Sequence, residues 1–501
     1  MTCSNRVLAR ASLAALTTVL AFAARAIAQA APSPPPSAAS SLPPATSTVP
    51  PNSLSAQLEE LGAWVTAGKG HLGAAIVDVA TGKTLAAYDE HRPMNPASNT
   101  KILTAAAALD RFGPDYRFST GIYGKITDGV VAPLVLRGNG DPSLSMDNLW
   151  ELARALKALG AHRVVHVLVD QSYFDANFVP PAFASQPNEW APFRAPVSAV
   201  SLDENSVTLT VVPGRAGEPA AAWFDPPGFV DVHGAVTTRA NAPNDAVRLS
   251  LFPDRARLRA ELGGSIGEGT PRVRFSKRVE DPRLFGGYAL AEILRLSGVE
   301  VTGGVDLGGE SAHARLAYVE SEPLAVLVRK LGKDSDNFYA ETLFKALGAF
   351  RKSAPLRSED GAEAVLEWMK GVGAFEPCTR LTNGSGLFDA NLVTAMSLAT
   401  ALRVAYSSPR IGPDFAAQLA VGGVDGTLHS RFKKEADRRV VRAKTGTLDR
   451  VIALSGYVLS PPGQSPIAFS FLADGVAGRH TEVRDKMDAC VESIAANLWG
   501  K

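Results

Sequence analysis

The pattern of apolar and polar positions first predicts a helix followed by a strand hairpin. Apolar residues recur at helical spacing over 53–66, which predicts an amphipathic helix. A continuous apolar run over 73–79 predicts a buried strand, and 83–88, after a Thr-Gly turn, predicts the returning strand. This order favours an antiparallel sheet with helices packed on its faces.

The end of the chain has the same texture. Two apolar runs, Val451–Leu459 and Ile467–Ala473, are separated by proline and glycine and predict paired strands. The spacing over 481–499 predicts an amphipathic closing helix. Helices and paired strands are therefore expected at both ends of the chain, as in an α+β fold.

The middle of the chain is predicted to contain both helices and strands. We predict a helix over 149–159, a single strand over 164–169, a strand over 206–212 and a helix over 283–297. The segment 213–273 is rich in glycine, proline and short apolar runs, which predicts a small β-rich insert.

The N-terminus predicts a targeting segment. Arg6 and Arg10 precede an apolar run over 11–24, and Ala28-Gln29-Ala30 is a small-x-small cleavage signal. Proline, serine and alanine dominate 31–51, which is typical of a semi-extended tether and not of a packed core. We therefore expect an exported protein that acts in the periplasm or another extracytoplasmic space.

Composition narrows the class of protein. The chain has 501 residues and a formal net charge of +1, which gives no argument for nucleic acid or an acidic surface as a partner. No apolar run of membrane-spanning length follows the targeting segment. Cys378 and Cys490 are the two cysteines beyond it, and export makes a disulfide between them an expectation.

Candidate chemistry begins at Ser98 and Lys101. They are three residues apart at a predicted helix start, so their side chains share one face. A serine hydroxyl needs an adjacent base, and burial and the positive helix end would lower the pKa of a lysine enough to supply one. A second Ser-x-x-Lys, Ser430 to Lys433, continues into Lys434 and is interpreted as a solvated basic loop.

Two further motifs follow in a characteristic order. Ser335-Asp336-Asn337 and Lys444-Thr445-Gly446, after Ser98-x-x-Lys101, form the three-motif set of penicillin-binding proteins and serine β-lactamases. The segments Ser335–Glu341, Asn383–Leu387, Gly423–Leu428 and Ala443–Leu448 make the chain resemble class C low-molecular-mass penicillin-binding proteins. That family contains D-alanyl-D-alanine carboxypeptidases and endopeptidases.

The resemblance implies a catalytic role for five residues. Ser98 resembles the acylated nucleophile and Lys101 its base. Ser335 resembles the hydroxyl that relays a proton to the leaving amine, and Asn337 resembles the group that holds the substrate amide. Lys444 is expected to add positive potential. The implied chemistry is acyl transfer with no metal and no cofactor.

Substrate-binding residues are implied in the same way. Thr445, Gly446 and Thr447 are expected to bind the substrate's terminal carboxylate, with the Thr447 and Ser98 backbone N–H groups forming an oxyanion hole. The family's peptides carry a side-chain amine, usually that of diaminopimelate. Asp203 is expected to pair with this amine, although an ordinary loop carboxylate is the alternative. Asn383 stands where the family usually has Asp, which is expected to weaken a loop contact.

The resemblance also implies how the chain is divided. The interval between Ser98 and Ser335 is far longer than a compact β-lactamase needs, and the family carries extra domains there. The expected division is a signal peptide (1–30), a tether (31–51), a penicillin-binding catalytic domain (52–115 and 315–501), an inserted domain II (116–212 and 274–314) and a nested β-rich domain III (213–273).

Three functions remain open at this point. The first is a penicillin-inhibited serine peptidase, carboxypeptidase or endopeptidase, acting on peptidoglycan stem peptides through an acyl-enzyme on Ser98. The second is a β-lactamase or esterase on the same scaffold, and the third is a catalytically silent peptidoglycan-binding protein. β-Lactams are expected as inhibitors, nucleic acid is not expected as a partner, and a homodimer is one of the oligomeric states left open.

Overall fold

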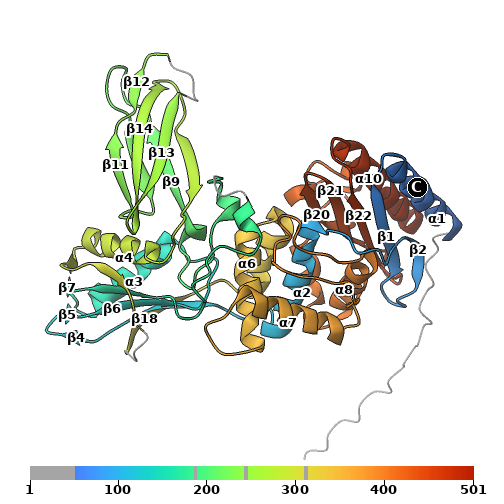
Figure 1. Ribbon diagram of the computed structural model, residues 1–501, viewed down its shortest axis with the longest axis horizontal. Helices are drawn as coiled ribbons and strands as arrows, with labels where there is room; N and C mark the ends of the chain where they lie inside the picture. Colours follow the sequence, from blue (N-terminus) through green and yellow to red (C-terminus); the bar gives the residue numbers. More distant parts are fainter. Residues whose placement is uncertain (1–50, 186–188, 242–245, 310–313, 501) are drawn as a thin grey trace, which may run out of the picture. The chain divides into compact units, whose positions relative to one another are not determined.

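The computed structural model in Figure 1 describes residues 51–185, 189–241, 246–309 and 314–500. The expected signal peptide (1–30) and the expected tether up to residue 50 lie outside the described residues. None of the helices in the described ranges combines the length and the apolar character that crossing a membrane requires.

A six-stranded antiparallel sheet joins the two ends of the described chain. Its order is β19–β20–β21–β22–β1–β2. The strands are β1 (His71–Asp78), β2 (Thr84–Tyr88), β19 (Ala420–Val421), β20 (Val441–Leu448), β21 (Val451–Val458) and β22 (Ile467–Asp474). Both predicted pairings, β1 with β2 and β21 with β22, are confirmed.

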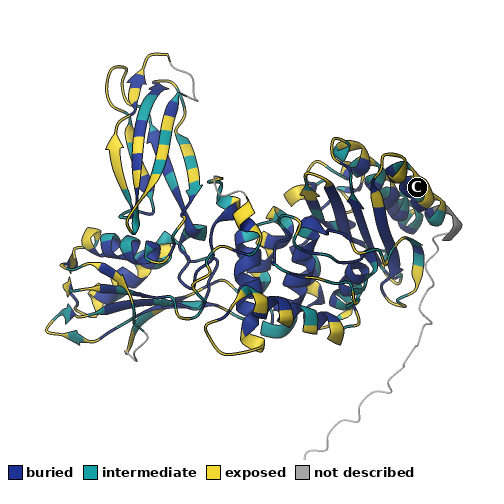
Figure 2. Cartoon of the chain, viewed as in Figure 1, coloured by how far each residue is buried: buried dark blue, intermediate teal, exposed yellow. Residues whose placement is uncertain are grey.

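The central strands β1, β21 and β22 are almost completely buried because helices cover both faces of the sheet (Figure 2). Alternate residues of β1 illustrate this: Ala74 and Ile76 join the core beneath α1 (Pro51–Ala67) and α10 (His480–Trp499), whereas Ala75 and Val77 join the core on the opposite face. The helices in that second layer are α2 (Thr100–Phe112), α5 (Leu324–Arg329), α6 (Asn337–Ala346), α7 (Ser358–Gly371), α8 (Ala395–Ser407) and α9 (Gly412–Gln418).

The segment between α2 and α5 forms separate sheets around its own core. One sheet has the order β17–β8–β6–β3–β18 and a smaller one the order β16–β7–β5–β4. They are accompanied by α3 (Met146–Ala158) and α4 (Phe285–Leu296). The strands are β3 (Ser119–Tyr123), β4 (Ile126–Thr127), β5 (Val130–Val131), β6 (Leu134–Gly138), β7 (Arg163–Val164), β8 (Val167–Asp170), β16 (Glu300–Val301), β17 (Val305–Leu307) and β18 (Arg315–Glu320).

The single strand predicted over 164–169 is wrong. β7 and β8 are separate strands in different sheets, each pairing in parallel with its own partners. Apart from His166, the run 164–169 is apolar, and an apolar run does not show which strand it pairs with, because an apolar residue can be buried in either sheet.

The nested segment is rich in β-structure, as predicted. It contains β10 (Ala221–Asp225), β11 (Val230–Gly234), β12 (Thr237–Arg239), β13 (Val247–Asp254) and β14 (Arg257–Gly267). β10 pairs with β9 (Ser206–Val212), which also pairs with β15 (Val273–Arg278). The expected boundaries at 213 and 273 therefore fall within one sheet, and the division into domains stays a prediction.

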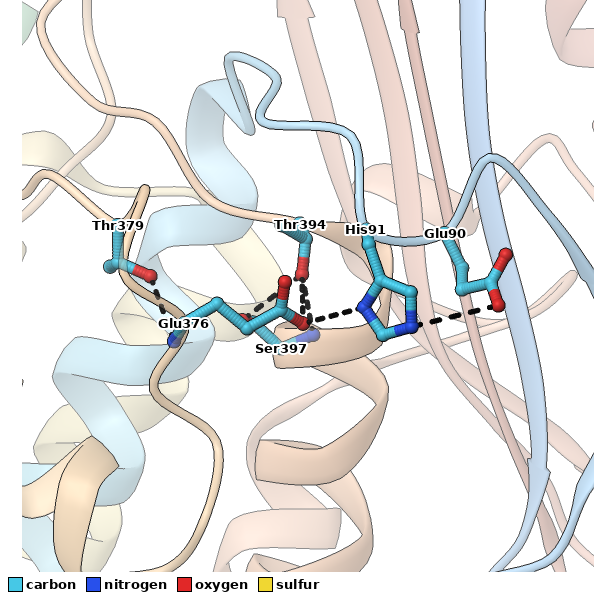
Figure 3. Close-up of polar contacts among 6 residues, drawn as sticks. All are labelled: Glu90, His91, Glu376, Thr379, Thr394 and Ser397. Carbon is cyan, nitrogen blue, oxygen red and sulfur yellow. Dashed lines mark hydrogen bonds and ion pairs between the residues drawn. The ribbon is translucent and has the colours of Figure 1, made fainter.

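The expected disulfide is wrong, because Cys378 and Cys490 are free. Cys490 is buried in α10, in the core between that helix and the sheet. Cys378 lies in a loop after α7 that Figure 3 shows tied to the start of α8: Thr394 caps α8 and donates to Glu376, while the Thr379 hydroxyl accepts from the Glu376 backbone. Each thiol is thus held by a different set of tertiary contacts.

This arrangement predicts two thiols of unequal reactivity. Burial raises the pKa of Cys490 to about 11, and the thiolate is the reactive species, so iodoacetamide should leave Cys490 unmodified in the native protein. Half-exposed Cys378 should react under the same conditions. Peptide mass spectrometry before and after denaturation measures both. A disulfide-linked peptide in unreduced protein would contradict the prediction.

Candidate active site

Ser98 lies in a strained turn that presents its hydroxyl. The 3₁₀ turn η1 (Ala97–Asn99) leads directly into α2. Ala97 has a left-handed φ of 47°, and its backbone N–H donates to Asn95 Oδ1 at 2.8 Å. Residues 94–97 and 99–100 are buried, whereas Ser98 is half-buried. The turn therefore leaves the Ser98 side chain accessible, although the residues on either side of it are buried.

Lys101, one turn later, has three polar contacts, one of them with Ser98. Its amine is 1% exposed and lies 3.0 Å from Ser98 Oγ, 2.7 Å from Asn337 Oδ1 and 2.8 Å from the Ser385 carbonyl oxygen. The two carbonyl oxygens can only accept hydrogen bonds, whereas the hydroxyl can also donate. A neutral amine that donates to both carbonyls must direct its lone pair at the Ser98 hydroxyl.

Burial also favours the neutral amine. It lowers the pKa of Lys101 to about 7, against the negative charges of Glu341 and Asp336, which raise the pKa. The expected pairing of Ser98 with a lysine of lowered pKa is therefore present. Ser430 and Lys433 are both exposed, and Phe432 between them has a left-handed φ of 56°, which agrees with a solvated loop.

The second motif joins this pair from the start of α6. Ser335 follows a π-helical turn over 330–334 and has a left-handed φ of 60°. The Asp336 carboxylate caps α6 by accepting the Tyr339 backbone N–H at 2.9 Å. Asn337, the first residue of α6, uses its oxygen for Lys101 and donates its nitrogen to the Phe193 carbonyl at 3.1 Å. The amide thus links Lys101 to the inserted segment.

The third motif lies on β20 and completes the cluster. Lys444, 1% exposed, donates to Ser335 Oγ at 2.8 Å and to the Thr445 carbonyl at 2.7 Å. Burial first, and then the like charge of Lys101, hold the pKa of Lys444 well below its usual value. The Thr445 hydroxyl donates to Thr427 Oγ1 at 2.9 Å, and Thr447 is exposed. All three motifs therefore meet around two buried amines.

Close backbone contact holds η1 against β20. The Asn99 side chain bonds to both β20 and β21. Its amide nitrogen lies 2.9 Å from the Lys444 carbonyl of β20, and its oxygen lies 2.7 Å from Ser455 Oγ of β21. Gly446 faces the Ser98 turn, and a Cβ there would lie 2.9 Å from the Pro96 carbonyl and 3.1 Å from Ala97 Cβ. The third motif can approach the nucleophile because residue 446 has no side chain.

Asp203, in the inserted segment, is committed to a contact with the start of α3. Its carboxylate accepts the backbone N–H of Met146 at the start of α3, and burial raises its pKa to about 6. Its neighbour Glu204 is affected by Asp336: burial first, and then that carboxylate, raise the pKa of Glu204 to about 7. Asp203, Glu204 and Asn205 all have positive φ angles. Recognition of an amine by Asp203 stays a prediction.

The sequence did not reveal that the loop at 384–385 and Glu341 complete the pocket around Lys101. The Ser385 carbonyl contacts Lys101, and Glu341, 2% exposed, accepts the backbone N–H groups of Gly384 and Ser385. Ser385 and Glu341 lie within motif segments of the sequence, but residue type does not reveal the contact made by a backbone carbonyl. Asn383 is fully engaged: its oxygen accepts from Gly386, and its nitrogen donates to the Leu387 and Pro181 carbonyls. A carboxylate at 383 could not donate these two bonds.

No cluster of three or more histidine, cysteine or acidic side chains in the described ranges could hold a metal ion. The chemistry that these residues themselves offer is proton transfer between hydroxyls and amines. Ser98 with Lys101, and Ser335 with Lys444, form two such pairs.

Known proteins resemble this chain over most of its length. A D-alanyl-D-alanine carboxypeptidase of Actinomadura sp. (strain R39) is 33% identical over 430 residues, which cover 81% of this chain and 78% of that protein. The D-alanyl-D-alanine carboxypeptidase DacB of Haemophilus influenzae is 26% identical over 426 residues, covering 83% and 88%.

The fold is shared with a solved structure, penicillin binding protein 4 of Haemophilus influenzae. The TM-score is 0.70 at 24% identity, covering 89% of this chain and 99% of that one. The predicted fold, a penicillin-binding scaffold with a long insertion, is confirmed at this level. The family described as D-Ala-D-Ala carboxypeptidase 3 (S13) matches residues 54–497, and the chain belongs to that family.

Proposed function

We propose that the chain hydrolyses the D-Ala–D-Ala bond, or a peptide cross-link, of peptidoglycan through an acyl-enzyme on Ser98. Membership of the family makes it a serine-type D-Ala-D-Ala peptidase. The observation that carries the role of Ser98 is the buried Lys101 amine, held 3.0 Å from its hydroxyl by two acceptor-only carbonyls.

Acylation follows from this contact. Neutral Lys101 accepts the hydroxyl proton while Ser98 Oγ attacks the peptide carbonyl, forming a tetrahedral intermediate. The Ser98 and Thr447 backbone N–H groups are proposed to stabilise its oxyanion. The C–N bond then breaks, leaving the acyl group on Ser98 Oγ.

The leaving amine needs a proton, and the second buried pair can deliver it. Ser335 Oγ lies 2.8 Å from Lys444 Nζ, so the hydroxyl can pass a proton to the amine and recover one from the lysine. A proton then passes from Lys101 through solvent to Lys444, which restores both amines to their starting state. Neutral Lys101 accepts a proton from the water that attacks the ester and returns it to Ser98 Oγ as the acyl group leaves. In a β-lactam the leaving nitrogen stays attached to the acyl group, which accounts for inhibition by penicillin.

The remaining motif residues suit substrate binding. Asn337 is proposed to hold the substrate amide, and Thr445, Gly446 and Thr447 the terminal carboxylate, next to the positive potential of Lys444. Export to an extracytoplasmic compartment, where this substrate occurs, remains part of the proposal.

The function is tested by covalent labelling and product release together. Ser98→Ala should abolish both the labelling of the protein by fluorescent penicillin and the release of D-Ala or of un-crosslinked peptides from peptidoglycan fragments. Ser430→Ala is the matched control and should leave both unchanged. A stable label without product release would indicate a silent binding protein, and rapid turnover of penicillin alone would indicate a β-lactamase.

Lys101 predicts the pH dependence of acylation. With a pKa of about 7, the amine is protonated and lacks a lone pair below this pH, so the acylation rate should rise through about pH 7 and level off above it. Lys101→Arg keeps the charge but cannot act as a neutral base, and should be nearly as slow as Lys101→Ala. Substantial acylation by Lys101→Arg, measured by stopped-flow fluorescence, would show that charge alone suffices.

The carboxylates beside the second motif predict substrate selectivity. Asp203→Asn and Glu204→Gln should each lower kcat/KM about ten- to thirtyfold for a peptide with a free side-chain amine. A peptide with that amine acetylated should be unaffected. Exposed Asp147, close to Asp203 on the first turn of α3, provides the control Asp147→Asn. Equal losses on both peptides would assign Asp203 and Glu204 to the fold.

A further inference from the structure

Glu341 is a buried acid for which the proposed mechanism has no use. It is 2% exposed, and its two carboxylate oxygens lie 3.1 Å from the Gly384 backbone nitrogen and 2.8 Å from that of Ser385. Burial raises the pKa of Glu341, whereas these two N–H groups, a side-chain hydrogen bond with Ser385 and the charge of Lys101 act in the opposite direction and favour the ionised carboxylate. A buried charge is costly unless such bonds compensate it, so its presence calls for an explanation.

The loop that Glu341 binds is also held closely against two helices. The Gly384 carbonyl accepts the Thr104 hydroxyl of α2 at 2.8 Å. A Cβ at residue 384 would lie 2.4 Å from Phe344 Cβ and 2.7 Å from the Ala340 carbonyl of α6. The peptide of Ser385 is thereby fixed in position, and its carbonyl is one of the two acceptors for Lys101.

Glu341 and Asn337 are four residues apart on α6 and so share one face of the helix. Asn337 reaches the Lys101 amine directly, and Glu341 reaches it through the Ser385 peptide. We propose that Glu341 is a positioning residue for the Lys101 base: it fixes the Ser385 carbonyl so that the free lone pair of Lys101 points at Ser98. This inference rests on the proposed acylation of Ser98.

The charge of Glu341 has a separate, measurable effect. In the described part of the chain, Glu341 and Asp336 of α6 raise the pKa of Lys101, and Lys444 of β20 is the like charge that faces it. Removing the negative charge at 341 must therefore lower the pKa of Lys101 further. The amine would then become neutral, and acylation would begin to rise, at a lower pH.

The test compares acylation by fluorescent penicillin as a function of pH in three variants. Glu341→Gln removes the charge and places a donor against one loop N–H, so its maximal rate should fall at least about tenfold. Its rise with pH should also shift downward by about one pH unit. Glu341→Asp keeps the charge but shortens the reach, so its rate should fall while its rise stays at the wild-type pH.

The control for lost packing is Thr342→Val on the same helix, because the Thr342 hydroxyl is buried and bonds only to the Phe338 carbonyl of its own helix. It should keep the wild-type pH dependence. An unshifted rise in Glu341→Gln would contradict the effect of its charge on Lys101, and a wild-type maximal rate would overturn the positioning role. If Glu341→Gln does not fold, a wild-type rate in Glu341→Asp would overturn it.

Peptide mapping of the wild-type adduct separates this inference from the proposed function. A label on Ser98 establishes acylation independently, so that a wild-type maximal rate in Glu341→Gln then counts against the positioning role alone. A label on another residue would overturn both.

Discussion

The burial of the Lys101 amine is the constraint on which the site depends. A lysine in water is protonated at neutral pH and has no lone pair to accept a proton from serine. Here the amine is almost completely buried, and its pKa falls to about 7. The same burial requires partners for its N–H groups, and the Asn337 and Ser385 carbonyls supply them. Protonation state and direction of the lone pair thus follow from one set of contacts.

A second buried amine lies nearby, and the two lysines affect each other. The charge of Lys101 lowers the pKa of Lys444, so burial of both amines disfavours a state in which both are protonated. Such a pair suits a reaction that takes a proton from one hydroxyl and delivers one to a leaving amine. The distances from Lys101 to Ser98 and from Lys444 to Ser335 fit these two transfers.

The sheet is what allows these groups to meet. Helices on both faces bury β1, β21 and β22 almost completely. β20, which pairs with β21, carries Lys444. Gly446 lets β20 approach the Ser98 turn, and Asn99 bonds to the strands beneath it. The inserted segment reaches the same place through the Phe193 carbonyl and the Asp203–Glu204 turn. The insert therefore takes part in holding Asn337 in place.

The sequence by itself determined the features written in residue type and periodicity. The three motifs identified Ser98, Lys101, Ser335, Asn337 and Lys444, and apolar runs located the paired strands of the main sheet, because a strand buried on both faces leaves a continuous hydrophobic signal. What residue type does not encode was decided by tertiary structure. The acceptor at Ser385 is a backbone carbonyl that any residue possesses, and Glu341 matters only because of the loop that it binds. The separation of β7 from β8, the helix contact of Asp203 and the isolation of Cys378 from Cys490 likewise depend on which distant segments pack together. Distances between such segments are set by the packed core as a whole, and no local pattern records them.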